Sequence, residues 1–352
     1  MAPVIHELQK QKIPFEVCIT AQHREMLDQV LDFFEVKPDF DLNLMKQGQS
    51  LNGLSAEIFK NIDEVFSSSQ PDLVLVHGDT TTSVIVAMAA FHKGIKVGHV
   101  EAGLRTFNRN SPFPEEINRQ LTARLASIHF APTLRAKENL LRENISEGEI
   151  FITGNTVVDA LEWSEKKIED LTFTAVSDVT GINFTGIEKF VLVTGHRREN
   201  FGEGLNQICL ALKKLSDHVQ IIFPVHLNPN VQQEVYGELN ENKNVHLINP
   251  VSYQIMLWLI RNCEFIISDS GGIQEEAPSF GKKVLVTREN SERSEGIESE
   301  FAILVGSNSH CILKEGLQLL NSPFKTEAGN PYGDGKASKK IIYSLKMHFG
   351  LI

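Results

Sequence analysis

Acidic side chains follow neighbouring predicted strands in the first half of the chain, at the points where those strands end. LVLVHGDTTTS (residues 73–83) places Asp79 directly after an apolar run, and VGHVEAGLRT (97–106) places Glu101 after the next one. SPFPEEINRQLT (111–122) then sets Glu115 at the start of a predicted helix, with Arg119 four residues later. Since parallel strands end at a common edge of their sheet, we expect the three carboxylates to share one crevice suited to acid–base chemistry.

Each of these residues also has an ordinary structural explanation. Asp79 could cap the following helix, Glu115 and Glu116 in a first helical turn favour the helix dipole, and Arg119 could pair with Glu115 at i,i+4. Carboxylates gathered at one sheet edge repel one another unless something pairs or protonates them. Their accumulation therefore favours a functional site.

The second half of the chain places cationic side chains at strand ends. LVTGHRREN (192–200) puts His196, Arg197 and Arg198 directly after a strand, and PVHLNPN (224–230) supplies His226 after the next. Adjacent arginines suit a phosphate or carboxylate ligand.

A glycine-containing junction gives the strongest local signal. In FIISDSGGIQEEAPSFG (265–281) a buried strand runs into Ser270, Gly271 and Gly272, and a helix follows. Glycines there allow a phosphate to approach the free N–H groups at the helix N-terminus. Glu276, one turn later, is placed to accept hydrogen bonds from ribose hydroxyls. The junction favours a nucleoside diphosphate ligand.

The elements that position these residues alternate between apolar runs and helical stretches. Helices are predicted at residues 1–11, 154–163 and 339–349, and strands at 15–20, 73–76, 97–100, 128–131, 190–193, 220–224, 245–247, 265–268 and 283–286. Continuous apolar strands separated by helices indicate parallel sheets covered on both faces, and hence an α/β fold of two Rossmann-like domains.

The domain limits follow from this pattern. The first domain is expected to comprise residues 1–154, with the C-terminal helix of 336–352 packing back on it, and the second to comprise 155–335. The charged stretch 164–190 is expected to form the connection between them.

Composition excludes several classes of function. The net charge is −11 and no basic run is present, which argues against a nucleic-acid partner. No apolar run approaches the roughly 20 residues of a membrane span, and no signal peptide is recognisable, so a cytoplasmic protein without a membrane partner is expected. Cys18, Cys209, Cys263 and Cys311 are widely spaced and are expected to be buried free thiols. No GxGxxG, P-loop or metal-ligand spacing occurs, so no cofactor is expected.

At these residues the chain closely resembles the non-hydrolysing bacterial UDP-N-acetylglucosamine 2-epimerases. The matching segments, which cover nearly the whole chain in order, are TAQHREMLDQVLDFF, DFDLNLMKQGQSL, VLVHGDTTT, VGHVEAGLRT, SPFPEEINRQLT, HFAPT, IFITGNTVVDAL, VTGHRRENFGEGL, PVHLNPNV, DSGGIQEEAPSFG and NPYGDGKAS. The resemblance implies a glycosyltransferase-B architecture, two Rossmann-like domains facing a cleft, and a homodimer.

The resemblance also implies a reaction. These enzymes eliminate UDP from UDP-N-acetylglucosamine to give 2-acetamidoglucal, and then add UDP back with a proton on the other face, yielding UDP-N-acetylmannosamine for cell-surface polysaccharide synthesis. The steps need acid–base groups and cationic or dipolar groups for the diphosphate, but neither a metal nor a nicotinamide.

Residue roles carry over by motif. The implied acid–base residues are Asp79, Glu101 and Glu115, with His196 assisting from across the cleft and Arg119 positioning Glu115 or the substrate. The implied UDP-binding residues are Ser270, Gly271, Gly272 and Glu276, with Arg197, His226 and Arg293 nearby. Gln22 and Gln49 match positions that bind a second UDP-N-acetylglucosamine as an activator in some family members.

The chain departs from the family pattern in two places. In SERSEGIESEFA (291–302), Ser294 replaces a proline, and Glu300 and Phe301 replace Gly-Thr. Family members also begin with a strand and a F-G-T-R-P-E-A-I-K segment, whereas this sequence starts at the Met that follows. Strands 15–20 and 73–76 are therefore expected to lie on either side of an unoccupied strand position in the sheet. The chain is expected to have very low epimerase activity and a less stable first domain.

Two alternatives stay open. A transferase of the same architecture would need an acceptor, and a truncated nucleotide-sugar-binding chain would bind UDP with little catalysis.

Overall fold

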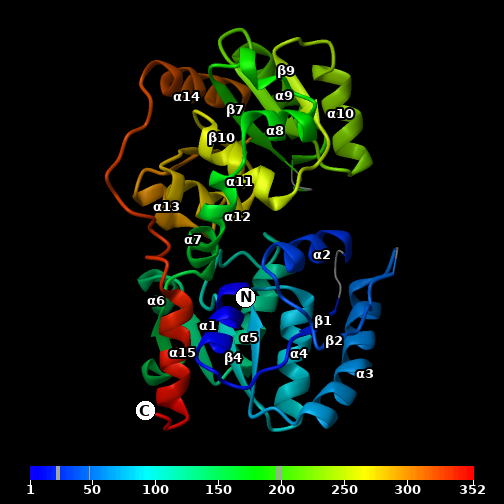
Figure 1. Cartoon of the computed structure of the whole chain (residues 1–352), viewed down its shortest axis with the longest axis vertical. Coiled ribbons are helices and arrows are strands. Elements are labelled where there is room, and N and C mark those ends of the chain that lie inside the picture. Colours follow the sequence, from blue (N-terminus) through cyan, green and yellow to red (C-terminus); the bar gives the residue numbers. More distant parts are fainter. Residues whose placement is uncertain (21–23, 47, 196, 198–199) are drawn as a thin grey trace. The chain divides into compact units, whose positions relative to one another are not determined.

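The computed structural model describes the whole chain except residues 21–23, 47, 196 and 198–199, and the side chains of residues 25 and 26. The chain forms two compact units (Figure 1), unit 1 being Met1–Ala160 with Tyr332–Ile352, and unit 2 being Leu161–Pro331. The division falls at 160/161 and 331/332, where the sequence predicts 154/155 and 335/336. Both units contain parallel sheets flanked by helices, which confirms the α/β fold class.

Unit 1 is built on a four-stranded parallel sheet of order β3-β4-β5-β6. The strands are β3 (Leu73–His77), β4 (Lys96–Val100), β5 (Ile128–Ala131) and β6 (Ile150–Ile152). Side chains alternate between the two faces, as the pleat requires. Val74 and Val76 pack beneath α3 (Leu51–Ser69) and α4 (Thr81–His92), whereas Leu73 and Leu75 face the layer of α1 (Ala2–Lys10) and α15 (Ala337–His348).

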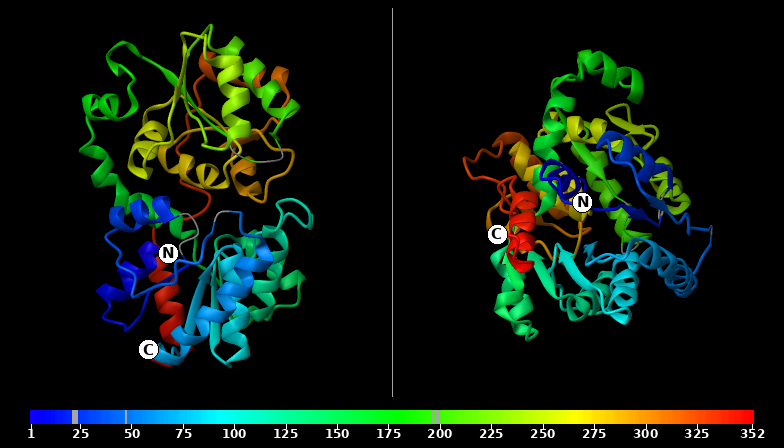
Figure 2. Two further views of the ribbon diagram at one scale, coloured as in Figure 1. Left: turned by 90° about the vertical axis from the view of Figure 1, so that its right-hand side faces the viewer. Right: turned by 60° about the horizontal axis from the view of Figure 1, so that its bottom comes forward.

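Helix α15 completes the core of unit 1. Ile341, Ile342 and Leu345 of this helix join Val4 and Leu8 of α1 in one hydrophobic cluster against the sheet. The two helices lie side by side in every view, α1 in dark blue and α15 in red (Figures 1 and 2). The remaining helices of the unit are α2 (Arg24–Phe33), α5 (Glu115–Leu125), α6 (Leu134–Arg142), η1 (Glu147–Glu149) and the first part of α7 (Thr156–Glu169).

A separate two-stranded parallel sheet in unit 1 joins β1 (Cys18–Ile19) to β2 (Phe40–Asp41). The predicted strand 15–20 is thus a strand over only two residues, and β2 was not predicted because two residues carry no readable alternation. Within the described part of the chain, β1 does not pair with β3, and β3 ends the larger sheet.

Unit 2 is built on a six-stranded parallel sheet of order β9-β8-β7-β10-β11-β12. The strands are β7 (Phe190–Thr194), β8 (Gln220–Pro224), β9 (Val245–Ile248), β10 (Ile266–Ser268), β11 (Val284–Val286) and β12 (Ala302–Leu304). In chain order this is the 3-2-1-4-5-6 arrangement of a Rossmann fold. Its topological switch point, where such sheets bind ligands, lies between β7 and β10.

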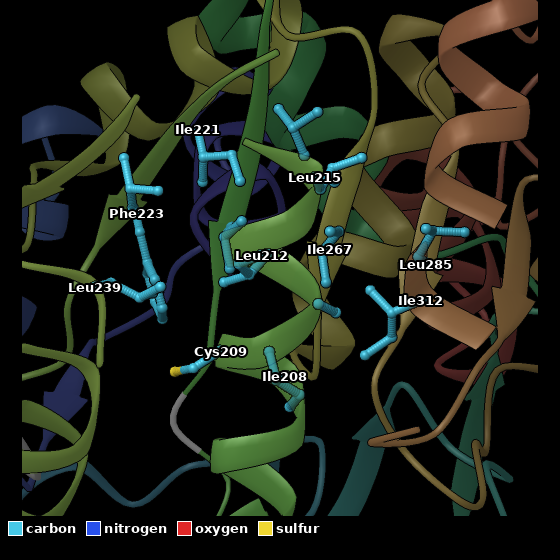
Figure 3. Packing of buried hydrophobic residues seen from close by; sticks show 14 of the residues in the cluster. Ile208, Cys209, Leu212, Leu215, Ile221, Phe223, Leu239, Ile267, Leu285 and Ile312 are labelled. Carbon is cyan, nitrogen blue, oxygen red and sulfur yellow. The ribbon is translucent and has the colours of Figure 1, made fainter. Parts of the chain in front are cut away.

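Helices cover both faces of this sheet. On one face α9 (Glu203–Leu215) packs Leu212 among Ile221, Phe223 and Ile267 of the strands (Figure 3), with α10 (Pro229–Leu239) and α14 (Ser309–Asn321) beside it. On the other face α11 (Tyr253–Asn262) contributes Trp258 to a second cluster. Shorter helices are α8 (Phe173–Thr180), η2 (Phe184–Gly186), α12 (Gly271–Glu276), η4 (Ala277–Phe280) and α13 (Ser294–Glu298).

The stretch 164–190 is not an inter-domain connection, so that prediction is wrong. Ile168, Val176, Ile182 and Phe184 of this charged stretch are buried in the second cluster of unit 2. The many charged residues of 164–190 made the stretch resemble a solvent-exposed linker, although four of its apolar residues are buried.

The cysteines are free thiols, but only two of them are buried. Cys209 and Cys263 lie in the core of unit 2, whereas Cys18 and Cys311 are exposed, so the expected burial is wrong for these two. Cys18 points outward from β1, and Cys311 lies in the first turn of α14. Among the described helices, none combines the length and apolarity that a membrane span needs.

Candidate active site

Asp79 lies in the turn that links β3 to α4, and two residues of α5 hold it there. Arg119, which is only 3% exposed, forms an ion pair with the Asp79 carboxylate. Asn118 Nδ2 donates a hydrogen bond to the backbone carbonyl of Asp79 at 2.9 Å. One helix therefore fixes both the backbone and the side chain of this candidate residue.

Glu101 follows β4 directly and has a left-handed backbone conformation, with φ +64°. Its Oε2 lies 3.2 Å from His77 Nε2 and accepts a hydrogen bond from Asn155 Nδ2 at 3.4 Å. A Cβ atom on Gly78 would lie 3.9 Å from Glu101 Oε1, so the carboxylate sits over the turn that carries Asp79. The strand ends thus bring Asp79 and Glu101 together. A strained backbone at a non-glycine residue is typical of functional positions.

Glu115 and Glu116 open α5 but have different surroundings. Glu115 Oε2 is buried and has no hydrogen-bond partner among the described residues. Glu116 is fully buried and accepts hydrogen bonds from the backbone N–H groups of Thr106 and Phe107 at 3.0 and 3.1 Å. The ion pairs of Arg119 run to Glu116 and Asp79 rather than to Glu115, four residues before it. The alternative of an i,i+4 pair between Glu115 and Arg119 is therefore not realised, and Glu115 Oε2 is buried without a partner in the described part of the chain.

His99 stabilises the turn that precedes Asp79. It is fully buried in β4, and its Nε2–H donates to the Gly78 carbonyl at 2.8 Å. Burial lowers the pKa of His99 to about 3, because an imidazolium would lose its hydration inside the protein. The neutral ring is therefore a fixed donor that holds the turn before Asp79.

In unit 2, a small and mainly apolar cavity of about 10 Å³ lies at the switch point between β7 and β10. Its lining includes Gly195, Arg197, Asn200, Asp269 and Thr287. Asp269 is 1% exposed and accepts hydrogen bonds from Arg197 N at 2.9 Å and from Asn200 Nδ2 at 3.2 Å. Arg197 Nε is buried without a hydrogen-bond partner in the described part of the chain, so this guanidinium retains a donor for an anion. His196 and Arg198 lie outside the described residues.

The Ser270–Gly272 junction follows β10 at the same sheet edge. Ser270 is the N-cap of α12, and its N–H donates to Ser268 Oγ at 2.9 Å. A Cβ atom on Gly271 would lie only 2.5 Å from Arg293 Nη1, which explains why glycine occupies this position. Arg293 is held by Glu275 at 2.8 Å and by Glu292. Gly271 and Arg293 therefore pack against each other in the interior, whereas Ser270 is half-buried and Gly272 is exposed.

Glu276, the last residue of α12, is 8% exposed. Its Oε1 accepts a hydrogen bond from the Tyr253 hydroxyl at 3.0 Å. Burial raises the pKa of Glu276 to about 7, and the hydrogen bond from Tyr253 opposes that rise. A carboxylate that is so poorly hydrated binds further hydroxyl donors readily.

Other predicted positions are less enclosed. His226 follows β8 on the exposed surface, and its Nδ1 accepts from Asn228 N at 3.1 Å. Gln49 Oε1 accepts from Lys46 N at 3.3 Å, and Gln22 lies outside the described residues. In the described ranges, no group of three or more His, Cys, Asp or Glu side chains could hold a metal ion.

Sequence reasoning assigned four residues of these sites no role; it interpreted His77 as a structural histidine and did not name the other three. His77, Asn155, Asp269 and Tyr253 contact predicted site residues, but each does so across a gap of more than 20 residues or from a neighbouring strand end. The positions of His77 and Asp269 at strand ends were the signal that could have identified them.

Comparison with known proteins supports the resemblance. A family model described as UDP-N-acetylglucosamine 2-epimerase matches residues 6–346. A UDP-N-acetylglucosamine 2-epimerase from Salmonella borreze is 49% identical over 352 residues, covering 97% of this chain and 93% of that protein. The Neisseria meningitidis UDP-GlcNAc 2-epimerase, solved with UDP-GlcNAc, gives a TM-score of 0.93 at 47% identity and 99% and 96% coverage.

A more distant structure agrees. The Methanocaldococcus jannaschii UDP-GlcNAc 2-epimerase in complex with UDP-GlcNAc and UDP gives a TM-score of 0.86 at 34% identity, covering 98% of this chain and 95% of that one. The match runs through both units and every described strand-end segment. The chain therefore belongs to the UDP-N-acetylglucosamine 2-epimerase family.

Proposed function

We propose that the protein interconverts UDP-N-acetylglucosamine and UDP-N-acetylmannosamine by eliminating UDP and adding it back. In the elimination, the C2 proton passes to a base of the protein while the bond from C1 to the UDP oxygen breaks, giving 2-acetamidoglucal and UDP. Re-addition of UDP with a proton delivered to the opposite face of C2 completes the inversion. The observation that carries this proposal is the family membership of the chain together with Asp79, paired with Arg119, and Glu101, beside His77, at the ends of neighbouring strands; Glu115 at the start of α5 is proposed to join them.

Unit 1 would supply the acid–base groups. The pairing of Asp79 with Arg119 keeps Asp79 a carboxylate. Glu101 Oε2 lies 3.2 Å from His77 Nε2. Glu115 Oε2 has no donor among the described residues, so substrate would provide its first partner. His196 is proposed to assist.

Unit 2 would hold UDP. The Arg197 guanidinium and the Ser270–Gly272 backbone are proposed to bind the diphosphate, with Arg293 supporting the junction and His226 nearby. Glu276 would accept from the ribose hydroxyls. These assignments place the leaving group beside cationic and N–H donors, which stabilise the charge that develops on UDP as the C1–O bond breaks.

The decisive experiment follows the purified chain with UDP-N-acetylglucosamine by NMR in D2O, without any added acceptor. Epimerisation through the glucal predicts UDP-N-acetylmannosamine that carries deuterium at C2. Turnover that requires an acceptor would instead favour a transferase, and UDP binding without turnover would favour the binding-only alternative.

Three finer parts of the proposal rest on the sequence and the resemblance. We propose a homodimer, a cytoplasmic location, and a second UDP-N-acetylglucosamine at an activator site that includes Gln22 and Gln49. Light scattering, cell fractionation and the dependence of rate on substrate concentration in Gln49→Ala test them in turn.

A further inference from the structure

Tyr253 and Glu276 form a contact that the proposed reaction does not by itself require. Tyr253 is the first residue of α11, and Glu276 is the last residue of α12. The tyrosine hydroxyl donates to Glu276 Oε1 at 3.0 Å across a separation of 23 residues. The contact therefore ties the helix that follows β9 to the helix that carries the Ser270–Gly272 junction.

Both partners are held by packing, so the contact has a defined geometry. The Tyr253 ring lies against the hydrophobic cluster that also contains Ile273 and Ala277, on either side of Glu276 in the chain. Ser252 caps α11 by accepting from Ile255 N at 3.5 Å, which fixes the turn that presents the tyrosine. A carboxylate anchored on one oxygen loses most of the rotational freedom of a glutamate side chain.

The two carboxylate oxygens of Glu276 differ in their hydrogen bonding. Oε1 is occupied by Tyr253, whereas within the described residues no donor reaches Oε2. Glu276 is nevertheless 8% exposed, which is too little for full hydration of an ionised group. A ligand that brings hydroxyl groups would satisfy Oε2.

We propose that Tyr253 is a positioning residue for nucleotide recognition: it holds Glu276 by Oε1 so that Oε2 faces the ribose hydroxyls of UDP. The inference rests on the proposed function, because it assumes that Glu276 binds the ribose. It adds that the affinity for a ribonucleotide depends on a side chain that does not itself touch the ligand.

The test is a cycle of two proteins and two ligands, measured by calorimetry. UDP and 2′,3′-dideoxy-UDP, which lacks both ribose hydroxyls, are titrated into the wild-type protein and Tyr253→Phe. We expect Tyr253→Phe to weaken UDP binding about five- to tenfold and to change dideoxy-UDP binding less than twofold, because only UDP offers donors to Glu276. Tyr236→Phe, at a partly exposed tyrosine of α10, is the matched control and should change neither affinity.

The outcomes separate the positioning role from the function beneath it. An equal loss for both ligands would mean general damage to unit 2 and would overturn the proposal, as would no loss for either. In Glu276→Ala, adding Tyr253→Phe should cause no further loss for UDP; an additive loss also overturns it. If the wild type binds both ligands equally, the ribose assignment of Glu276 fails and the inference falls with it, whereas absence of UDP binding refutes the proposed function itself.

Discussion

At the scale of single residues, the candidate site in unit 1 combines ion pairing with backbone strain. Glu101 keeps a left-handed conformation that costs an ordinary residue about 1–2 kcal/mol. Glycine would adopt it freely, but a glycine has no carboxylate to place beside His77 and Asn155. Backbone strain of this kind is typically retained where the position of the side chain is needed for function.

Asp79→Asn tests the acid–base assignment. The amide keeps the size of the side chain but can neither take up a proton nor form a charged pair with Arg119. We expect turnover to fall by about 100-fold or more, which is the usual decrease in rate when a general acid or base is removed. In this variant Arg119 retains its ion pair with Glu116 at 3.3 Å, so its buried guanidinium stays paired. The melting temperature should therefore change little.

Asp63→Asn is the matched control for that experiment. Asp63 lies in α3 of the same unit, with a side chain that is 63% exposed and forms an ion pair with Lys93. It should leave turnover intact. A comparable loss in both variants, or full activity in Asp79→Asn, contradicts the assignment.

Gly271→Ala and Gly272→Ala separate structural from ligand-related needs for glycine. A Cβ at 271 would lie 2.5 Å from Arg293 Nη1, whereas at 272 it would meet nothing nearer than 3.9 Å. Gly271→Ala should therefore lower the free energy of unfolding of the ligand-free protein by about 1–3 kcal/mol, and Gly272→Ala by less than about 0.5 kcal/mol. Both should weaken UDP binding if a phosphate approaches this backbone.

Urea unfolding without ligand and calorimetry with UDP make the comparison. Full UDP affinity in Gly272→Ala would refute a close phosphate approach at that residue. Equal ligand-free stabilities of the two variants would refute the packing of Arg293 over Gly271.

The residue scale also shows what a sequence can and cannot reveal about a site. Asp79, Glu101 and Glu276 were predictable because strand ends and a helical turn confine them. The pairing of Arg119 with Glu116 rather than Glu115, and the hydrogen bond from Tyr253, depend on the packing of helices that sequence spacing alone does not define.

At the scale of elements, strand β4 makes unit 1 sensitive to acid. The pKa of buried His99 is lowered to about 3, below its value of about 6.5 in the unfolded chain, so the unfolded state binds the proton first. The stability contributed by the neutral ring is complete above pH 6.5 and is lost progressively as pH falls toward 3. At pH 5 the loss from this residue is about 2 kcal/mol.

His99→Gln preserves an amide donor for the Gly78 carbonyl but cannot titrate. We expect it to reduce the loss of stability between pH 7.5 and 5 in urea unfolding. His218→Gln, at an exposed position, is the control. An unchanged pH dependence in His99→Gln would show that His99 is not the sensitive group.

The turn between α13 and β12 illustrates a local conflict between sequence and backbone. Glu300, which stands where the resembling family has glycine, is exposed and has φ +62°. Glu300→Gly should raise the free energy of unfolding by about 0.5–1 kcal/mol, because relief of the strain exceeds the added freedom of the unfolded chain.

Glu300→Ala isolates the cause, since it removes the carboxylate and keeps the Cβ. It should leave stability nearly unchanged. If both substitutions stabilise equally in thermal unfolding, the carboxylate rather than the backbone is responsible.

Elements differ in how far the sequence predicts them. Strands such as β5 and β8 agree with their predicted bounds because their apolar runs are continuous. Strands β2, β6 and β12, of two or three residues, were not predicted, although β10 and β11, of three residues each, were; such short strands are defined by the neighbouring strands with which they pair.

At the scale of the whole molecule, the division into two units predicts an uneven response to nucleotide. If UDP binds at the switch point of unit 2, hydrogen exchange should slow chiefly around the ends of β7 and β10 and in α12. At 100 times Kd the stabilisation would be about 2.7 kcal/mol. Protection concentrated instead in the sheet of unit 1 would contradict the assignment of UDP to unit 2.

The order of α15 in the chain has a consequence for biosynthesis. Unit 1 begins at the first helix, yet its core needs Ile341, Ile342 and Leu345 from the last one. All of unit 2, Leu161–Pro331, is translated between these two parts. On the ribosome, the domain that starts first is therefore the one that finishes last. Until α15 emerges, the apolar surface of α1 and the sheet it covers lacks its final partner, and a nascent chain in that interval is the form most in need of a chaperone.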